Sequence, residues 1–296
     1  MRNLLMSSVV ALTMTSSAFA ICPQWTAKRV GSLDKNMIDE ASGLVTSVLQ
    51  KGKFIWVNDS GAEPVLYATG MDGKVVRKVK MANFPNTDFE AMAMGPCPSN
   101  RGESCIYVGD IGSGMGWRSS LKIGIFKEKD FWSFGSIRPE YVIETKYPNG
   151  VNNSEAMVVT PEGQILFLSK AEGNTQIFVI APNGRMSLVA SVDTTKMLTG
   201  TRGKGPLITD AAISPDGDKL LMLSYSDIIE VNLKSLVGIT QRQWKPGVDF
   251  NVIKGPGLPQ QETVTYDGQN SFIISSESEE EADGAPQIYS YTCNGF

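Results

Sequence analysis

The sequence predicts an all-β protein, a β-propeller of five four-stranded blades in which a strand from the N-terminal end of the chain completes the last blade. Three observations support this prediction. One strand pattern recurs five times, an acidic residue opens each copy, and the last copy is one strand short. Repeats of about 55 residues that each hold four antiparallel strands are typical of propeller blades.

Each repeat begins with an acidic residue and a short apolar strand, followed by a Gly or Pro turn and a second apolar strand that ends in polar residues. The first strands begin DEASGLV, DFEAMAMG, NSEAMVV, TDAAISPDG and QETVTYDG. Such short apolar or alternating runs, bounded by Gly, Asn, Asp and Pro, indicate strands rather than helices. The leading acids are separated by 50, 65, 55 and 52 residues, and they are Glu40, Glu90, Glu155, Asp210 and Glu262.

The last repeat has only three strands before the chain ends, the third being Gln287–Cys293. We expect its fourth strand to come from Trp25–Val30, which would close the ring. An all-β sandwich is the alternative fold. It would explain the strands, but not the acids in register or a strand supplied from the far end of the chain.

The first twenty residues have the features of a signal peptide. Arg2 precedes an apolar run from Leu4 to Met14, and Ala18-Phe19-Ala20 has the small-x-small form of a cleavage site. We therefore expect residues 1–20 to be removed and residues 21–296 to form a single propeller domain. The expected protein is periplasmic or secreted and monomeric, without a membrane span. A net charge of −4 without a basic face argues against a nucleic-acid partner.

Four cysteines in an exported chain favour two disulfides over free thiols or a metal site, and no CxxC pair is present. Cys22 and Cys293 lie at the two ends of the mature chain, where the closing strand would bring them together. Cys97 and Cys105 are eight residues apart and would close the first hairpin of the second repeat. We expect these two pairings.

The chain contains no histidine. A Ser-His-Asp triad, a histidine-ligated zinc or copper site and a histidine phosphoenzyme are therefore excluded. Any chemistry must come from carboxylates, hydroxyls, Lys, Arg or a hard cation such as calcium.

In a propeller, the start of each inner strand and the end of the second strand lie at the same end of the central channel. The five leading acids, from Glu40 to Glu262, are therefore candidate metal ligands around one channel end. The candidate ligand-binding residues there follow the second strands, and they are Asp59, Asp110, Lys170, Tyr225 and Glu277. Crowded carboxylates would repel one another, and a bound calcium ion would remove that cost. The alternative is that these acids only cap strand starts or pair with backbone N–H groups at blade junctions.

Two Gly-rich segments at the same end could bind an anion through backbone N–H groups and Arg side chains. One is TGTRGKGP, with Arg202 and Lys204, and the other is DIGSGMGWRS, with Trp117 and Arg118. Neither is a P-loop, and either could be a plain loop.

The order of these motifs resembles that of the calcium-dependent apyrases, which are secreted five-bladed propeller nucleotidases. The resemblance is carried by DFEAMAMG followed by YVGDIGSGMGW, and by NSEAMVV with LFLSK. It implies acids around a central calcium ion. The basic residues of the family's nucleotide site are matched only by Lys170, Arg118 and Arg202. The six-bladed β-propeller phytases are a weaker match.

Two function classes follow from these expectations. The first is a binding module that holds a small phosphorylated ligand, a glycan or a peptide at the acid-rich end. The second is a calcium-dependent phosphohydrolase, nucleotidase-like or phytase-like. In that case Glu90 or Glu155 would position the attacking water, and Lys170 or Arg118 would neutralise charge on the phosphate.

Overall fold

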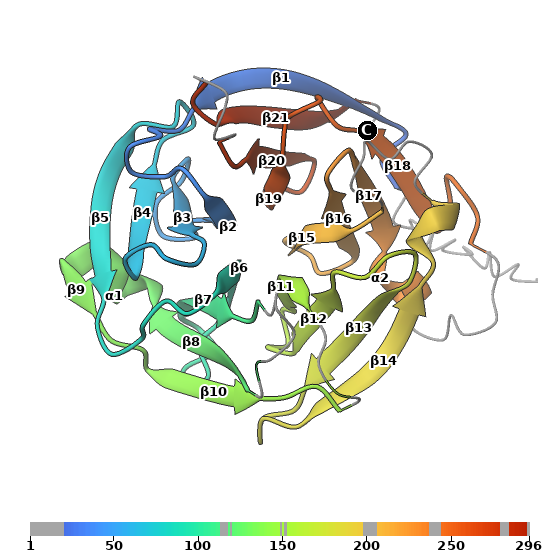
Figure 1. Cartoon of the computed structure of the whole chain (residues 1–296). Helices are drawn as coiled ribbons and strands as arrows, with labels where there is room; N and C mark the ends of the chain where they lie inside the picture. Colours follow the sequence, from blue (N-terminus) through green and yellow to red (C-terminus); the bar gives the residue numbers. More distant parts are fainter. Residues whose placement is uncertain are drawn as a thin grey trace, which may run out of the picture.

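The structure, a computed structural model, describes residues 21–112, 118, 120–148, 150, 153–197, 206–236, 244–278 and 284–294. Five antiparallel sheets stand around a central channel (Figure 1). The predicted all-β propeller with five four-stranded blades is confirmed.

The innermost strands surround the channel, and they are β2 (Ala41–Thr46), β6 (Phe89–Pro96), β11 (Ser154–Val159), β15 (Ile208–Ile213) and β19 (Gln261–Gly268). The second strands are β3 (Phe54–Asn58), β7 (Ser104–Asp110), β12 (Ile165–Ser169), β16 (Lys219–Ser224) and β20 (Ser271–Ser276). These pairs match the predicted repeats, so we number the blades 1 to 5 in this order.

The third strands are β4 (Val65–Thr69), β8 (Leu121–Lys127), β13 (Thr175–Ile180), β17 (Asp227–Asn232) and β21 (Gln287–Asn294). The outermost strands are β5 (Val75–Met81), β10 (Tyr141–Thr145), β14 (Met186–Val192), β18 (Phe250–Lys254) and β1 (Gln24–Ser32). The helical segments are α1 (Glu128–Ser133), a 3-10 turn at Thr194–Lys196, and α2 (Leu233–Leu236). None of the described helices is both long and apolar enough to span a membrane.

Burial decreases from the channel outward. Every residue of β3 is buried, whereas β5 alternates between exposed and covered side chains. The reason is that both faces of an inner strand pack against neighbouring blades, while an outer strand meets water on one side. The described residues form five apolar clusters, one between each pair of adjacent blades. The core of this protein is therefore a set of blade interfaces around the channel.

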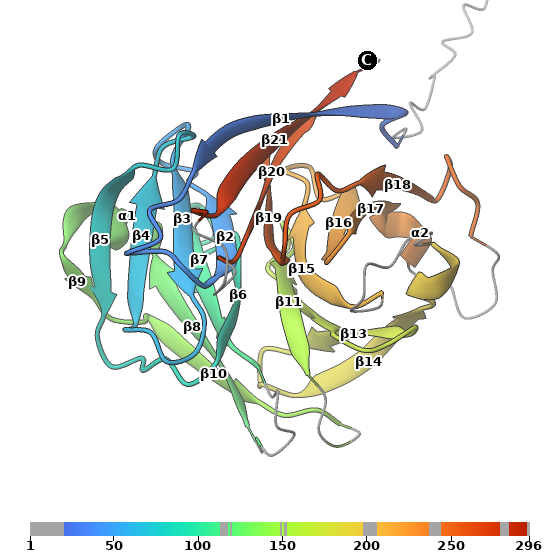
Figure 2. The same ribbon diagram turned by 45° about the horizontal axis from the view of Figure 1, so that its top comes forward.

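The ring closes as predicted. Strand β1 pairs antiparallel with β21 from Gln24↔Asn294 to Ser32↔Gln287, and both views show the two strands side by side (Figure 2). The Cys22–Cys293 disulfide joins the same two ends, with 5.9 Å between the Cα atoms. Glu230 of β17 accepts a hydrogen bond of 3.0 Å from the Cys22 N–H, which anchors this segment to blade 4.

The second disulfide, Cys97–Cys105, closes the β6–β7 hairpin as predicted. Two disulfides are typical of proteins from oxidising compartments. The sequence did not predict strand β9 (Ser136–Ile137), which follows α1 and adds a short parallel strand to the outer edge of β5. The Arg77 guanidinium of β5 fixes this addition by donating to the carbonyl oxygens of Phe131 and Phe134, at 2.6 and 2.7 Å.

Candidate functional site

All five inner strands contain the same irregularity near their start. In each one, the pairing with the second strand skips a single residue. The skipped residues are Ser42, Glu90, Glu155, Thr209 and Glu262. A β-bulge of this kind leaves one residue unpaired and redirects its side chain. The fold therefore repeats one special position five times around one end of the channel.

This register corrects the predicted set of five equivalent acids. Glu90, Glu155 and Glu262 do occupy the bulge position of blades 2, 3 and 5. Glu40 instead lies two residues before the bulge of blade 1, and Asp210 lies one residue after the bulge of blade 4. The sequence pattern missed the difference because a shift of one or two residues is invisible without the strand partners.

The bulges of blades 1 and 4 carry hydroxyls that tie blades together. Ser42 Oγ donates to the Phe89 carbonyl at 2.7 Å, and Thr209 Oγ1 donates to the Gln261 carbonyl at 2.6 Å. The fully buried Asp210 carboxylate has a similar role, because it accepts the N–H groups of Ala211 and Val264 at 2.8 and 2.6 Å. Its contacts are those of a structural acid between blades 4 and 5.

Three carboxylates of blades 1 and 2 come together at this end of the channel. Asp59, Asp88 and Glu90 each place one carboxylate oxygen within 4.8 Å of the others. The Glu90 side chain is buried, yet no described residue donates a hydrogen bond to it or forms an ion pair with it.

Asp88 was not among the predicted ligands, although the DFEAMAMG motif begins with it. The backbone shows its place in the repeat. Asp59 N–H donates to the Glu40 carbonyl in blade 1, and Ile111 N–H donates to the Asp88 carbonyl in blade 2. Asp88 is therefore the blade 2 counterpart of Glu40, and it was hidden because the motif offers two acids two residues apart.

Gly112 covers one side of the carboxylate group. A Cβ atom at this residue would lie 2.4 Å from Asp88 Oδ2 and 2.6 Å from Glu90 Oε1. Asp110 holds the same loop, because its buried carboxylate accepts the Asp88 N–H at 2.8 Å and pairs with Arg118 at 2.9 Å. Asp110 and Arg118, both predicted ligand-binding residues, thus support the acids through contacts within the loop.

A cationic side chain lies on the blade 3 side of the same end. Lys170 follows β12 and forms a partly buried ion pair with Glu155. The Lys170 ammonium also lies 5.0 Å from the centre of the Tyr225 ring, which follows β16 of blade 4. Burial alone would lower the pKa of Lys170, but the Glu155 carboxylate raises it above the ordinary value, so the side chain stays charged.

Glu277 and Glu262 complete the site in blade 5. Burial, followed by the charge of Glu262 and a hydrogen bond with it, raises the pKa of Glu277 from 4.5 to about 10. Gln260 Nε2 donates to Glu277 Oε2 at 2.9 Å, which fixes this pair. At neutral pH the Glu277 carboxyl group therefore keeps its proton when no cation is present.

The other acids are also hard to ionise together. Burial, with added repulsion from Asp88, Glu262 and Glu40, raises the pKa of Asp59 from 3.8 to about 6. Burial raises the pKa of Glu155 from 4.5 to about 7 despite the attraction of Lys170. Burial and the charge of Glu155 raise the pKa of Glu90 well above its ordinary value. We call this group of residues the acidic end, and its members are Asp59, Asp88, Glu90, Glu155, Glu262 and Glu277.

The geometry of Asp59, Asp88 and Glu90 fits a calcium ion. Oxygen atoms bound to one Ca²⁺ at about 2.3–2.6 Å lie no more than about 5 Å apart, which agrees with the observed separation. All three candidate ligand atoms are carboxylate oxygens, which hard cations prefer. Trp117, Arg202 and Lys204, the remaining predicted ligand-binding residues, lie outside the described residues.

Comparisons with known proteins support the fold alone. No protein-family model and no curated protein sequence matches the chain. The PQQ-bound aldose sugar dehydrogenase of Streptomyces coelicolor is similar in structure, with 10% identity, a TM-score of 0.52, and coverage of 92% of this chain and 99% of that one. A luciferin-regenerating enzyme is similar with 10% identity, a TM-score of 0.50, and coverage of 92% and 96%. At this identity both similarities show a shared β-propeller architecture.

Proposed function

We propose that this chain is an exported propeller that binds Ca²⁺ through Asp59, Asp88 and Glu90 and uses the ion to hold an anionic ligand at the acidic end. The observation that carries the proposal is the convergence of these three carboxylates around a buried Glu90 that has no donor among the described residues. A buried carboxylate without a partner is costly, and a cation shared by three of them removes that cost.

The ligand would lie between the ion and the cationic side chains of the same end. Lys170 is held between Glu155 and Tyr225, so it is charged and fixed in place. A phosphate, carboxylate or acidic sugar could bind the calcium ion and Lys170 together, which is a common mode of anion recognition. A small phosphorylated ligand, a glycan or an acidic peptide fits this arrangement, and it requires no catalysis.

The test is thermal unfolding of the full chain in chelator and at increasing calcium concentrations, with calorimetric titration of the ion. A ligand that binds only the folded state adds about 2.7 kcal/mol at 100 times its Kd. We expect the melting temperature to rise with calcium in the wild type and not in Asp88→Asn/Glu90→Gln. Glu144→Gln is the matched control, because Glu144 is exposed on the outer strand β10 and should leave the rise intact. Equal melting temperatures in chelator and saturating calcium would overturn the proposal.

One observation favours a second function, calcium-dependent phosphohydrolysis. Glu155 has a pKa raised by burial to about 7 and contacts the cationic Lys170, so it could accept a proton from water near neutral pH. Hydrolysis of nucleoside diphosphates and of phytate should be measured with and without calcium. Turnover that needs both calcium and Glu155 would establish the enzyme. Calcium binding without turnover would establish the binding module.

A further inference from the structure

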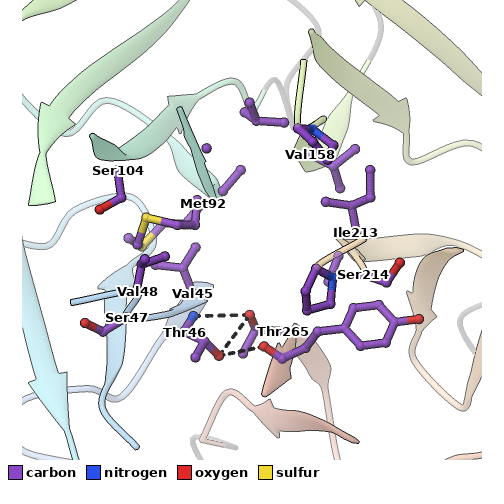
Figure 3. Close-up of a pocket in the computed structure, with 18 of the residues that line it drawn as sticks. Val45, Thr46, Ser47, Val48, Met92, Ser104, Val158, Ile213, Ser214 and Thr265 are labelled. Atoms are coloured by element: carbon purple, nitrogen blue, oxygen red, sulfur yellow. Dashed lines mark hydrogen bonds between the residues drawn. The ribbon is translucent and has the colours of Figure 1, made fainter. Parts of the chain in front are cut away.

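The opposite end of the central channel holds a second, chemically different pocket. Its volume is about 810 Å³, within the range of small-molecule sites of roughly 300–1,000 Å³. All five innermost strands contribute to its wall near their ends (Figure 3). One wall residue from each blade is Val45, Met92, Val158, Ile213 and Thr265. We call this pocket the apolar end.

The hydroxyl groups of Thr46, Ser47 and Ser214 in this wall are already hydrogen-bonded within the protein. Thr46 Oγ1 donates to the Tyr266 carbonyl at 2.8 Å, and the Thr46 N–H donates to Thr265 Oγ1 at 3.2 Å (Figure 3). Ser47 donates to Glu128, and Ser214 donates to Asp216. Most of the surface left for an occupant is apolar, and it includes methionine side chains, which adapt to varied apolar shapes.

Charge is confined to the rim. Two of the rim cations are Lys51 on the β2–β3 turn and Arg101 on the β6–β7 turn, which belong to adjacent blades. Neither forms a salt bridge with another described residue. Arg101 Nη2 donates to the Pro161 carbonyl of blade 3 at 3.4 Å, so its guanidinium leans across the rim.

Neither of the two acids that line the rim forms a salt bridge with Arg101. Glu103 is engaged by Lys129 at 2.7 Å and by Lys127 at 3.9 Å. Asp267 lies near the end of β19 in blade 5, beside the blade 1 of Lys51 and away from Arg101, which leans from blade 2 toward blade 3. The rim therefore presents the Arg101 guanidinium between blades 2 and 3, above an apolar shaft.

We propose that the apolar end binds a small amphipathic anion, with its apolar body in the channel and its single carboxylate or sulfonate at the Arg101 guanidinium. The apolar wall begins at Met92, only two residues after Glu90, but its charged rim lies at the far end of the channel. The inner strands are six to eight residues long, and at about 3.3 Å per residue they place the rim roughly 20 Å from the acids at the strand starts. Binding here should therefore not require calcium.

The test uses anilinonaphthalene sulfonate, a fluorescent probe with an apolar body and one anionic group, on the full chain in chelator. We expect saturable one-site binding that decanoate displaces and decylamine does not. Ile213→Gln places a polar amide in the partly exposed wall and should weaken probe binding about tenfold. Arg101→Glu reverses a rim charge and should weaken it several-fold. Lys74→Glu, on an exposed turn of blade 1, is the charge-matched control and should leave the affinity unchanged.

The melting temperature of each variant verifies that it folds. If decylamine displaces the probe as well as decanoate, the rim does not select an anion and the proposal fails. If Ile213→Gln folds and binds the probe with wild-type affinity, the probe lies elsewhere and the proposal also fails. Both results are obtained in chelator, so they are independent of whether the acidic end binds calcium.

Discussion

Glu90 and Glu128 are both buried glutamates, but they have opposite surroundings at the two ends of the channel. Glu128 is fully buried beside the apolar end, and its carboxylate accepts hydrogen bonds from Ser47, Ser104, the Leu49 N–H and Trp132. Glu90 lies at the acidic end among other carboxylates, and no described residue donates to it. Burial alone therefore does not distinguish a structural acid from a site residue. The number of hydrogen-bond donors around the carboxylate distinguishes them.

The largest expected effect on stability comes from removing Glu128, the acid whose oxygens are already hydrogen-bonded. Glu128→Ala leaves the Ser47, Ser104 and Leu49 N–H donors without an acceptor, and we expect it to lower the free energy of unfolding by about 3–5 kcal/mol. Glu90→Gln removes a repelled charge, so in chelator it should stay within about 1 kcal/mol of the wild type. Urea unfolding in chelator measures both. A loss at Glu90→Gln as large as that at Glu128→Ala would mean that Glu90 is a structural acid too.

A second prediction concerns pH. Folding raises the pKa of Asp59 to about 6 and that of Glu155 to about 7. A carboxyl group with a raised pKa contributes its full stability below its unfolded pKa and loses it as the pH rises through the folded value. In chelator, these groups should therefore destabilise the protein between about pH 4 and 7, each by on the order of 3 kcal/mol.

The pH effect is measured as the difference between wild type and Asp59→Asn, which cancels the contribution of other acids. We expect Asp59→Asn to gain stability relative to the wild type as the pH rises in chelator. With saturating calcium that gain should disappear, because the ion stabilises the ionised carboxylates. A difference that is independent of pH in chelator would show that repulsion at the acidic end is not significant.

The smallest expected effect comes from closing the space beside the acids. A Cβ at Gly112 would contact Asp88 and Glu90, so Gly112→Ala should cost about 1–3 kcal/mol and abolish the rise of melting temperature with calcium. Gly135→Ala is the matched control, because its added Cβ meets nothing within 4 Å and its backbone is not left-handed. A Gly112→Ala protein that keeps its calcium response would place the ion elsewhere.

Part of the site could be predicted from the sequence, because the position of a residue in the repeat determines its place along the channel. The acids Glu90, Glu155 and Glu262 recur at the start of similar strands, and a propeller places all such starts at one end of the channel. Asp59, Lys170, Tyr225 and Glu277 were predicted by the same logic from the ends of the second strands. The predicted calcium ion and ligand-binding roles of these residues remain proposals.

Other features could not be predicted, because they depend on pairing register and on side-chain partners. Asp88 and Glu90 are two residues apart in one motif, and only the folded ring shows that both meet Asp59 of the neighbouring blade. Asp210 has the same sequence context as the other acids, yet two backbone N–H groups occupy its oxygens. The apolar end left no motif, since its wall takes one or two ordinary apolar residues from each of five distant strands.

The sequence alone determined the number of blades, the closing strand and both disulfides, because these follow from the period of the repeat and from where its last copy falls short. Tertiary structure decided which acids meet, which are already satisfied, and that the two channel ends differ in chemistry. The physical reason is the distance along the chain over which each feature is set. A repeat is a local pattern that each copy displays, whereas the pKa of an acid, its hydrogen-bond donors and the shape of a cavity depend on residues from other blades.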